Sequence, residues 1–403
     1  MKKILYIADY LTYDWIDELK VPYSPAGKNK IENIIKSLTK AGFKVDLFST
    51  ISTRDWKIRK AKIEYPQKDV RIIRQKIRGF PIIRKFFSLT QFLLFLLKAR
   101  KNKEYDIILF YNFDASCPYA LLAKLILNKP TYIEYEDGLF TGFGISRFKK
   151  YLSILIEKVF LNLRLLHGGI LVNSNFIERT KLKNYVICHG FFRELDLTKE
   201  GSNKIPTLFF EDMFEKEKGF DILLKAIPHI KSKAHITVFG FGSLLKEAKN
   251  LESELKNNKN IIFEVNKEVN KDWGNLPQSE KHEKGYEYRI TNSDILLNLQ
   301  TTLHKFYDYS FPFKISNYLS TPNIIITTAN SDLEKLNQKL GNPMIIFDAS
   351  NPRDLAKKID VVIKNLRKYK EISKTNPEKY KKIAHYKIFS EKFKKLFENS
   401  TCS

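Results

Sequence analysis

A lysine at the expected start of a helix is the first feature of the sequence that points to chemistry. In SFPFKISNYLSTPNIIITT (310–328), Pro312 suits a first helical turn, Lys314 follows it, and an apolar strand comes directly after the helix. The free N–H groups at a helix start bind anions, and a lysine beside them adds a mobile cation. The segment therefore predicts a diphosphate site. An ordinary capped helix with a solvated lysine is the alternative.

Acidic residues end an expected strand in the first half of the chain. The segment TYIEYEDGLFTGFG (131–144) carries Glu134, Glu136 and Asp137. Strand alternation puts Glu134 and Glu136 on the same side, and Asp137 opens the following loop. A carboxylate there could orient or deprotonate a hydroxyl group, so Glu136 and Asp137 are candidate catalytic residues. Pairing with nearby lysines, or capping of the next helix, is the alternative.

Polar residues also follow two other expected strands. Asn112 and Asp114 come after DIILFY (106–111), and His189 ends YVICH (185–189). Asn112 and Asp114 could line the same cleft as the acids, and His189 could hydrogen-bond a sugar or a phosphate. A packed histidine at the domain edge is the alternative for His189. The seven histidines and three cysteines show no metal-ligand spacing, so we expect no metal site.

The elements that must position these residues alternate in type. Short apolar runs follow amphipathic segments along the whole chain, which is typical of βαβ units and parallel sheets. We expect strands at 3–8, 44–49, 70–74, 106–111, 131–136, 168–173, 185–189, 207–211, 235–240, 261–265, 294–300, 323–328 and 344–348. We expect helices at 28–41, 86–103, 115–128, 147–166, 219–230, 243–257, 281–292 and 311–320, and a pair of Lys-rich helices after about Asn351, interrupted near Pro377.

A polar segment divides this alternation in two. FRELDLTKEGSNKIP (192–206) contains Gly and Pro and lacks the apolar pattern, so it is the expected linker. The sequence predicts an α/β fold of two doubly wound, Rossmann-like domains facing across a cleft, at 1–195 and 196–375. A C-terminal helix at 376–403 is expected to pack back on the first domain. Open parallel sheets bind ligands at the carboxyl ends of their strands, so the candidate residues lie where ligands are expected.

The composition limits the class of partner. There are 70 Lys+Arg against 45 Asp+Glu, for a net charge of +25, which suits an anionic partner or reflects a basic drift of the solvated surface. No zinc spacing or DNA-reading helix motif accompanies the charge, so we expect no nucleic acid. Three scattered cysteines suit a reducing compartment, and no run is long enough to span a bilayer. These features favour a cytoplasmic protein.

One stretch combines positive charge with aromatic residues. Between Arg54 and Lys103 there are sixteen Lys or Arg and three Asp or Glu, interleaved with Ile, Phe and Leu. This composition is typical of a segment that lies on an anionic membrane surface. We assign residues 71–87 to such a contact at the inner face of the cell membrane, and the run FLLFLL (92–97) to the core. Packing of the whole segment on the first sheet is the alternative.

Five segments, taken in order, resemble a known enzyme family. They are SPAGKNKIENIIKSLTKAGFKVDLFST (24–50), EKGFDILLKAI (217–227), VFGFGS (238–243), SDILLNLQ (293–300) and SFPFKISNYLSTPNIIITT (310–328). Together they resemble family 4-like GT-B glycosyltransferases of bacterial polysaccharide, capsule and O-antigen clusters. The resemblance implies transfer of a sugar from a nucleotide-sugar to a glycan or lipid-linked acceptor. It implies retention of anomeric configuration, no metal, and no cofactor besides the nucleotide-sugar co-substrate.

The resemblance also assigns residues to the two substrates. On the donor side it implies that Lys314 and Lys218 stabilise the departing diphosphate. The full donor set is Lys218, Gly219, Gly240, Gly242, Phe313, Lys314, Ile315 and Asn317. On the acceptor side it implies Gly27, in a small-residue turn at Ala26–Gly27. The strand-end residues Asn112, Asp114 and His189 are our further acceptor-side candidates.

Two positions depart from the family. Asn317 stands where family members commonly carry a Glu that holds the donor's ribose, and Met213 lies near the place of a usual Arg. An amide cannot supply the charge-assisted hydrogen bond of a carboxylate. A GT-B-shaped subunit that binds glycan or a partner transferase, without turning over donor, is therefore the alternative function.

Overall fold

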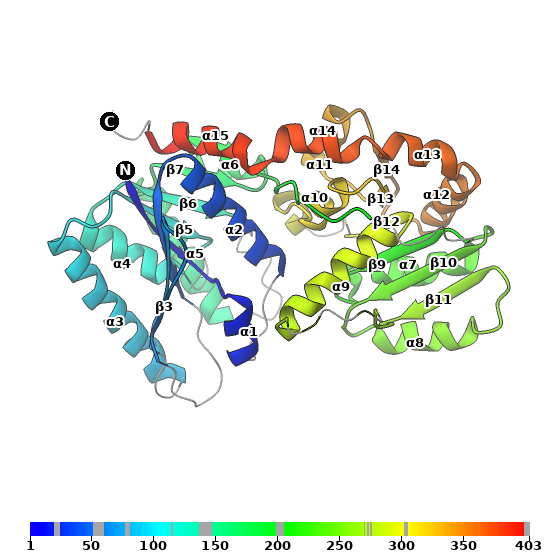
Figure 1. The fold of residues 1–403 in the computed structure, drawn as a ribbon, viewed down its shortest axis with the longest axis horizontal. Coiled ribbons are helices and arrows are strands. Elements are labelled where there is room, and N and C mark those ends of the chain that lie inside the picture. Colours follow the sequence, from blue (N-terminus) through cyan, green and yellow to red (C-terminus); the bar gives the residue numbers. More distant parts are fainter. Residues whose placement is uncertain are drawn as a thin grey trace. The chain divides into compact units, whose positions relative to one another are not determined.

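The computed structural model describes residues 1–19, 25–50, 60–76, 81–113, 116–136, 147–198, 205–269, 271, 274, 276–301 and 305–398. The chain divides into two compact units (Figure 1). The first unit is Met1–Phe191 with Tyr386–Ser403, and the second unit is Phe192–His385. Of the candidate site residues, Asp114 and Asp137 lie outside the described residues.

The first unit is built on a sheet whose described strands run in the order β3-β4-β2-β1-β5-β6-β7-β8. All neighbours are parallel except β3 and β4, which are antiparallel. The strands are β1 (Lys3–Ala8), β2 (Lys44–Ser49), β3 (Lys62–Gln67), β4 (Val70–Arg74), β5 (Ile107–Tyr111), β6 (Thr131–Tyr135), β7 (Gly168–Leu171) and β8 (Tyr185–Ile187).

Helices cover both faces of this sheet. The crossovers from β4 to β5, from β5 to β6 and from β6 to β7 all step in the same direction, and right-handed crossovers then place α3, α4 and α5 on one face. The step from β1 to β2 is in the opposite direction, so α2 covers the other face. The helices are α1 (Tyr13–Leu19), α2 (Pro25–Lys40), α3 (Pro81–Lys101), α4 (Cys117–Leu127), α5 (Arg147–Asn162) and α6 (Asn175–Thr180).

The C-terminal helix α15 (Tyr386–Glu398) completes the core of the first unit. Its apolar stripe includes Phe393 and Phe397, which are fully buried, and the Phe397 ring lies 5.7 Å from the Phe43 ring. Tyr132 donates a hydrogen bond to the Leu396 carbonyl across 3.3 Å. The part of the chain that packs back on the first sheet therefore begins at Tyr386, and residues 376–385 belong to the second unit.

The second unit is a parallel doubly wound sheet in the order β11-β10-β9-β12-β13-β14. Its strands are β9 (Thr207–Glu211), β10 (Ala234–Phe239), β11 (Ile261–Val265), β12 (Ile295–Asn298), β13 (Ile324–Thr327) and β14 (Met344–Ile346). Its helices are η1 (Lys216–Lys218), α7 (Phe220–Ala226), η2 (Ile227–His229), α8 (Leu245–Glu254), α9 (Gln278–Asn292), η3 (Lys305–Tyr309), α10 (Lys314–Leu319), α11 (Ser331–Lys339), α12 (Pro352–Lys364), α13 (Leu366–Ser373) and α14 (Asn376–Ala384).

Each expected strand is present, within a few residues at its ends, but some elements are new. The edge strand β3 was not expected because it is charged, contains Pro66 and is mostly exposed, so it lacks an apolar pattern. The helices α1, α6 and α11 were not expected either. The expected pair of C-terminal helices is wrong: the region holds α12 to α15, and Pro377 lies in the first turn of α14.

Candidate active site

In the second sheet the strand order reverses direction at β9, which makes this strand a topological switch point. The chain leaves β9 toward β10 on one side, and β12 pairs with β9 on the other side. In doubly wound sheets the crevice at such a point, outside the carboxyl ends of the strands, is where ligands bind. Glu211 and Asp212 stand at the carboxyl end of β9, so two acids mark this edge.

Lys314 reaches this edge from the start of α10. Its ammonium donates a hydrogen bond to the main-chain oxygen of Glu211 across 2.5 Å and forms an ion pair with the Asp212 carboxylate. Burial by itself would raise the pKa of Asp212, but the positive charges of Lys314 and Lys218 outweigh it, and the pKa lies below its ordinary value. The structure thus brings both predicted phosphate lysines to one carboxylate.

Gly219 fixes the segment that carries Lys218. Its φ of +72° lies in the left-handed region, and an added Cβ would overlap the carbonyl oxygen of Leu299, just after β12. The Thr301 amide donates to the Glu217 carbonyl across 3.2 Å, which holds the same two segments together. Glycine is therefore needed at position 219 for close packing beside the switch point.

Gly240 and Gly242, in the turn after β10, pack against the backbone of the segment that follows β9. A Cβ at Gly240 would overlap the Asp212 carbonyl oxygen, and one at Gly242 would lie 2.6 Å from the Phe214 carbonyl oxygen. The Phe214 amide donates to the Phe241 carbonyl across 2.7 Å. These glycines let two strand-to-helix loops approach closely, which supports the acids and lysines at this edge.

The remaining donor-side candidates lie on or beside α10. The Ile315 amide donates to the Pro312 carbonyl across 2.9 Å, so it is engaged within the turn, and the Phe313 side chain is half-buried. Asn317 is buried, and its amide donates to the Tyr286 hydroxyl on α9 across 3.2 Å. Asn317 therefore links α10 to α9.

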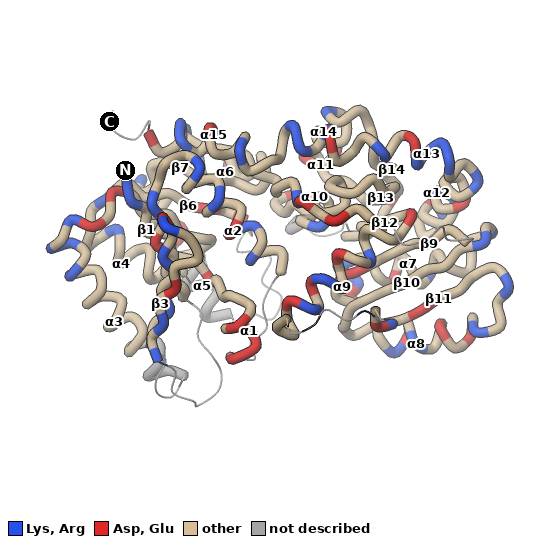
Figure 2. The backbone as a smooth tube through the Cα atoms, in the orientation of Figure 1, with Lys and Arg blue, Asp and Glu red and all other residues tan. Residues whose placement is uncertain are grey.

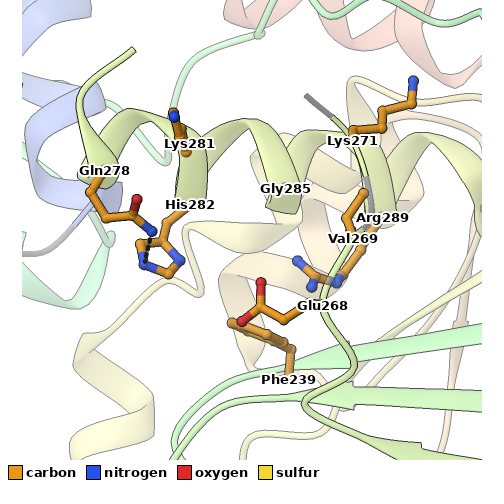
Figure 3. A pocket seen from close by; sticks show the side chains of 9 residues that line it. All are labelled: Phe239, Glu268, Val269, Lys271, Gln278, Lys281, His282, Gly285 and Arg289. Atoms are coloured by element: carbon orange, nitrogen blue, oxygen red, sulfur yellow. Dashed lines mark hydrogen bonds between the residues drawn. The ribbon is translucent and has the colours of Figure 1, made fainter. Parts of the chain in front are cut away.

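A cavity of about 190 Å³ lies at the carboxyl ends of β10 and β11 and along α9 (Figure 3). The Arg289 guanidinium lies 4.1 Å from the centre of the Phe239 ring and donates to the Lys267 carbonyl across 2.9 Å. Figure 3 shows one wall formed by successive turns of α9 and the opposite wall formed by Phe239 and the segment after β11. The lining residues are Phe239, Glu268, Val269, Lys271, Gln278, Lys281, His282, Gly285 and Arg289.

Glu211 connects the cavity residues with the lysines. Burial raises the pKa of its carboxyl to about 7, against the opposing charges of Lys314 and Arg289. Its Oε2 is buried and accepts no hydrogen bond from the described residues. The sequence analysis missed Glu211, Tyr286 and Arg289. A carboxylate at the end of the apolar run TLFFE was a usable signal for Glu211, whereas the two α9 residues had none.

The first unit has its own switch point, between β1 and β5, and a different charged cluster lies there. Lys30, on α2, is fully buried, and its ammonium lies 2.9 Å from a Glu136 carboxylate oxygen and 3.7 Å from one of Glu134. The Tyr111 hydroxyl donates to Glu136 across 2.5 Å, and the Tyr6 hydroxyl donates to Glu134. The sequence analysis did not predict Lys30 as the partner of these acids.

Glu134 is the carboxyl of this cluster whose pKa departs from its ordinary value. Burial is the largest cause and raises its pKa to about 7; the charge of Lys30 opposes the rise, and the neighbouring Glu136 adds to it. Asn112 ties the strand ends together, since its amide donates to the Glu134 carbonyl and its side chain accepts from the Glu136 amide, each across 2.8 Å. The cluster is largely enclosed by its own partners.

Two acceptor-side candidates have different surroundings. Gly27 lies in the first turn of α2, where we expected a loop; the helix begins at Pro25, which suits a first turn. His189 is half-buried after β8. Among the described residues, no group of three His, Cys, Asp or Glu is placed to hold a metal ion. None of the described helices combines the length and apolar character that crossing a membrane requires.

No protein-family model matches the chain, and the search of curated proteins finds no match. Solved structures match it over its full length. It is similar to Anabaena HepE in complex with UDP-glucose, with a TM-score of 0.63, 12% identity, and 100% of each chain covered. The chain has the GT-B fold. It is also similar to the apo form of the lipopolysaccharide outer core galactosyltransferase WaaB, with a TM-score of 0.60, 12% identity, and 98% of this chain and 99% of that chain covered.

A third GT-B structure adds a complex with several ligands. It is a variant of S. aureus TarM in complex with Fondaparinux, alpha-GlcNAc-glycerol and UDP, with a TM-score of 0.63 and 10% identity, covering 98% of this chain and 100% of that chain. The likeness to all three confirms the two-domain, parallel-sheet fold expected from the sequence.

Proposed function

We propose that this protein is a glycosyltransferase that moves a sugar from a nucleotide-sugar to a glycan or lipid-linked acceptor. The observation that carries the proposal is that Lys314 and Lys218 lie at the switch point of the second sheet, where Glu211 interacts with both Lys314 and Arg289, a residue that lines the neighbouring cavity. Two cations next to a cavity with an aromatic wall suit a nucleoside diphosphate. The full-length likeness to HepE bound to UDP-glucose supports the same ligand class.

The donor's diphosphate would lie against Lys314 and Lys218, and its nucleoside would extend into the cavity that Phe239 and Arg289 line. Negative charge develops on the diphosphate as the bond to the anomeric carbon breaks, and fixed cations there lower the barrier. The donor set is Lys218, Gly219, Gly240, Gly242, Phe313, Lys314, Ile315 and Asn317. In this set the glycines and Ile315 act through packing, and Asn317 acts through Tyr286.

The acceptor would be held by the first unit. A hydroxyl of the acceptor forms the new bond to the anomeric carbon, the nucleoside diphosphate leaves, and the hydroxyl proton passes to a base. Glu136 is our candidate for orienting this hydroxyl, because it combines an ion pair to Lys30 with partial exposure. Asp137, Asp114, Gly27, Asn112 and His189 complete the proposed acceptor side.

We further propose a hexosyl transfer with retention of configuration and without a metal, in surface polysaccharide biosynthesis. No cofactor is required beyond the nucleotide-sugar co-substrate, since Lys314, Lys218 and Arg289 supply positive charge. The proposed location is the cytoplasm, at the inner face of the membrane. The expected membrane contact through residues 71–87 is wrong for its first part, because Ile72, Ile73 and Arg74 are buried in the strand β4, which pairs with β2 and β3. Of residues 71–87, 77–80 lie outside the described residues.

A thermal-shift screen against UDP, GDP, TDP and their sugars tests the proposal. Ligand at about 100 times its dissociation constant stabilises the folded state by about 2.7 kcal/mol. We expect a rise in melting temperature with one nucleotide class, lost in Lys314→Ala and kept in Lys225→Ala, whose exposed lysine lies on α7. Release of the nucleoside diphosphate from the matching sugar donor then reports turnover.

A non-catalytic glycan-binding or partner subunit is the second candidate. It is favoured by the ion pair between Lys314 and Asp212 and by the hydrogen bond between Asn317 and Tyr286, because both occupy groups that a donor would need. A folded protein that no nucleotide or nucleotide-sugar stabilises would support this candidate and contradict the transferase.

A further inference from the structure

The outer face of the α3–α4–α5 layer exposes an unusual number of large apolar side chains. These residues are between 47% and 71% exposed, and they are Phe86, Leu94 and Leu97 on α3, Leu125 on α4, and Tyr151, Leu155 and Leu163 on or just after α5. The run FLLFLL is therefore divided: Phe92 and Leu96 are buried as expected, while Leu94 and Leu97 point outward. Single exposed apolar residues are common on protein surfaces, but a group of them on three adjacent helices indicates a surface that contacts another molecule.

The spacing of these residues shows that each helix presents one face outward. On α3, Phe86, Thr90, Leu94 and Leu97 are separated by four, four and three residues, which places them on one side of the helix. On α5, Tyr151 and Leu155 are four residues apart. The right-handed crossovers put all three helices on the same face of the sheet, so the outward sides form one continuous surface.

The charge of this layer has one sign. The helix α3 contains Lys and Arg, α4 contains Lys124, and neither helix contains Asp or Glu (Figure 2). The only acid in α5 is Glu157, which is buried and paired with Arg179 across 2.7 Å. Exposed basic residues border the apolar groups, namely Lys98, Arg100, Lys101, Lys103, Lys158 and Arg164.

We propose that the α3–α4–α5 face binds the surface of an anionic lipid bilayer. Apolar side chains between basic residues, with no exposed acid on the helices, are complementary to a membrane whose headgroups are negative and whose interior is apolar. A neutral or basic protein partner would not complement this uniform positive sign. The proposal extends the proposed function, because it places the first unit beside a lipid-linked acceptor, but vesicle binding does not require nucleotide binding.

Co-sedimentation with vesicles of phosphatidylcholine alone, or mixed with phosphatidylglycerol, tests the surface. We expect the full-length protein to bind the mixed vesicles and not the neutral ones, with affinity falling as salt is raised. Leu94→Gln with Leu155→Gln should weaken binding at least about tenfold. Lys98→Glu with Lys101→Glu should do the same. The matched controls are Val361→Gln and Lys256→Glu with Lys259→Glu, all at exposed positions of the second unit.

Three outcomes would overturn the proposal. They are equal binding to neutral and anionic vesicles, equal losses in the controls and in the face variants, and a dimer in sedimentation velocity that the leucine substitutions dissociate without any vesicle binding. Because all substituted residues are exposed, unfolding transitions should be unchanged, which identifies a loss of binding as a surface effect. Nucleotide-induced stabilisation, measured on the same samples, reports separately whether the proposed transferase function holds.

Discussion

The two units gather charged residues at equivalent edges of their sheets but neutralise them differently. In the first unit the ammonium of Lys30 is enclosed between Glu134 and Glu136, and two tyrosine hydroxyls complete the cluster. Each cluster keeps a buried carboxylate oxygen without a hydrogen bond from the described residues, on Glu134 in the first unit and on Glu211 in the second. The difference is that Lys314 is only half-buried and that a cavity lies beside Arg289, whereas Lys30 is fully buried. A closed cluster fixes strand ends, whereas an open one has binding capacity left for a ligand.

The largest effect should come from opening the closed cluster. Lys30→Met removes the cation and leaves two buried carboxyls without it, so we expect the free energy of unfolding to fall by about 3–5 kcal/mol. Lys36→Met, at an exposed position on the same helix, should change it by less than about 0.5 kcal/mol. Urea unfolding followed by circular dichroism measures both. A loss below about 1 kcal/mol for Lys30→Met would mean that the cluster is not closed.

The next effect tests the packing that supports the open cluster. Gly219→Ala adds both left-handed strain and an overlap with the Leu299 carbonyl, so we expect a loss of about 3 kcal/mol. Gly42→Ala has the same kind of strain, at φ +90°, but nothing lies within 4 Å of the added Cβ, and it should lose about 1 kcal/mol. Equal losses in urea unfolding would show that the contact with Leu299 does not matter.

The pH dependence of stability reports on one carboxyl in each cluster. The pKa values of Glu134 and Glu211 are each raised to about 7 in the folded protein, above the ordinary value of an unfolded Glu near 4.3. The folded state therefore binds more protons. The stability that each carboxyl contributes is complete below about pH 4.3 and is lost as the pH rises through 7, with a slope of at most about 1.4 kcal/mol per pH unit.

Glu134→Gln and Glu211→Gln should each remove part of this slope. If the second cluster is the open one, saturating nucleotide should alter the slope that depends on Glu211 and leave the slope that depends on Glu134 unchanged. Denaturant unfolding between pH 5 and pH 8, with and without nucleotide, measures this. If nucleotide instead removed the slope that depends on Glu134, the nucleotide would bind at the cluster of the first unit, which would contradict the proposed donor site.

The smallest effect should come from adding a positive charge at Met213, an uncharged residue next to Asp212 in the cluster of the second unit. Met213 is exposed beside Asp212, and Met213→Arg adds a cation there. We expect tighter binding of a nucleoside diphosphate by about fivefold, which corresponds to about 1 kcal/mol. Isothermal titration calorimetry measures the change, with Met1→Arg, also at an exposed methionine, as the control. Unchanged affinity would place the diphosphate away from Met213.

Much of the fold followed from the sequence, because each central strand is a short apolar run that is covered on both faces. The runs KILYIA and TLFFE, for example, coincide with β1 and β9. Less could be predicted where burial is partial. The strand β3 is exposed on an edge, and the outward Leu94 and Leu97 lie in the same run as the buried Phe92, so hydropathy alone could not separate them.

By itself, the sequence determined the two successive βαβ domains, the strand end that carries Glu134 and Glu136, the helix start that carries Lys314, and the basic stretch between Arg54 and Lys103. These are local properties of residue type and spacing. Only the tertiary structure decided which charges meet. Lys314 pairs with Asp212, 102 residues away, and Lys30 lies between Glu134 and Glu136, because strand order brings distant segments to one sheet edge. Burial at those edges then set which carboxyls titrate near neutral pH, and no pattern along the chain contains that information.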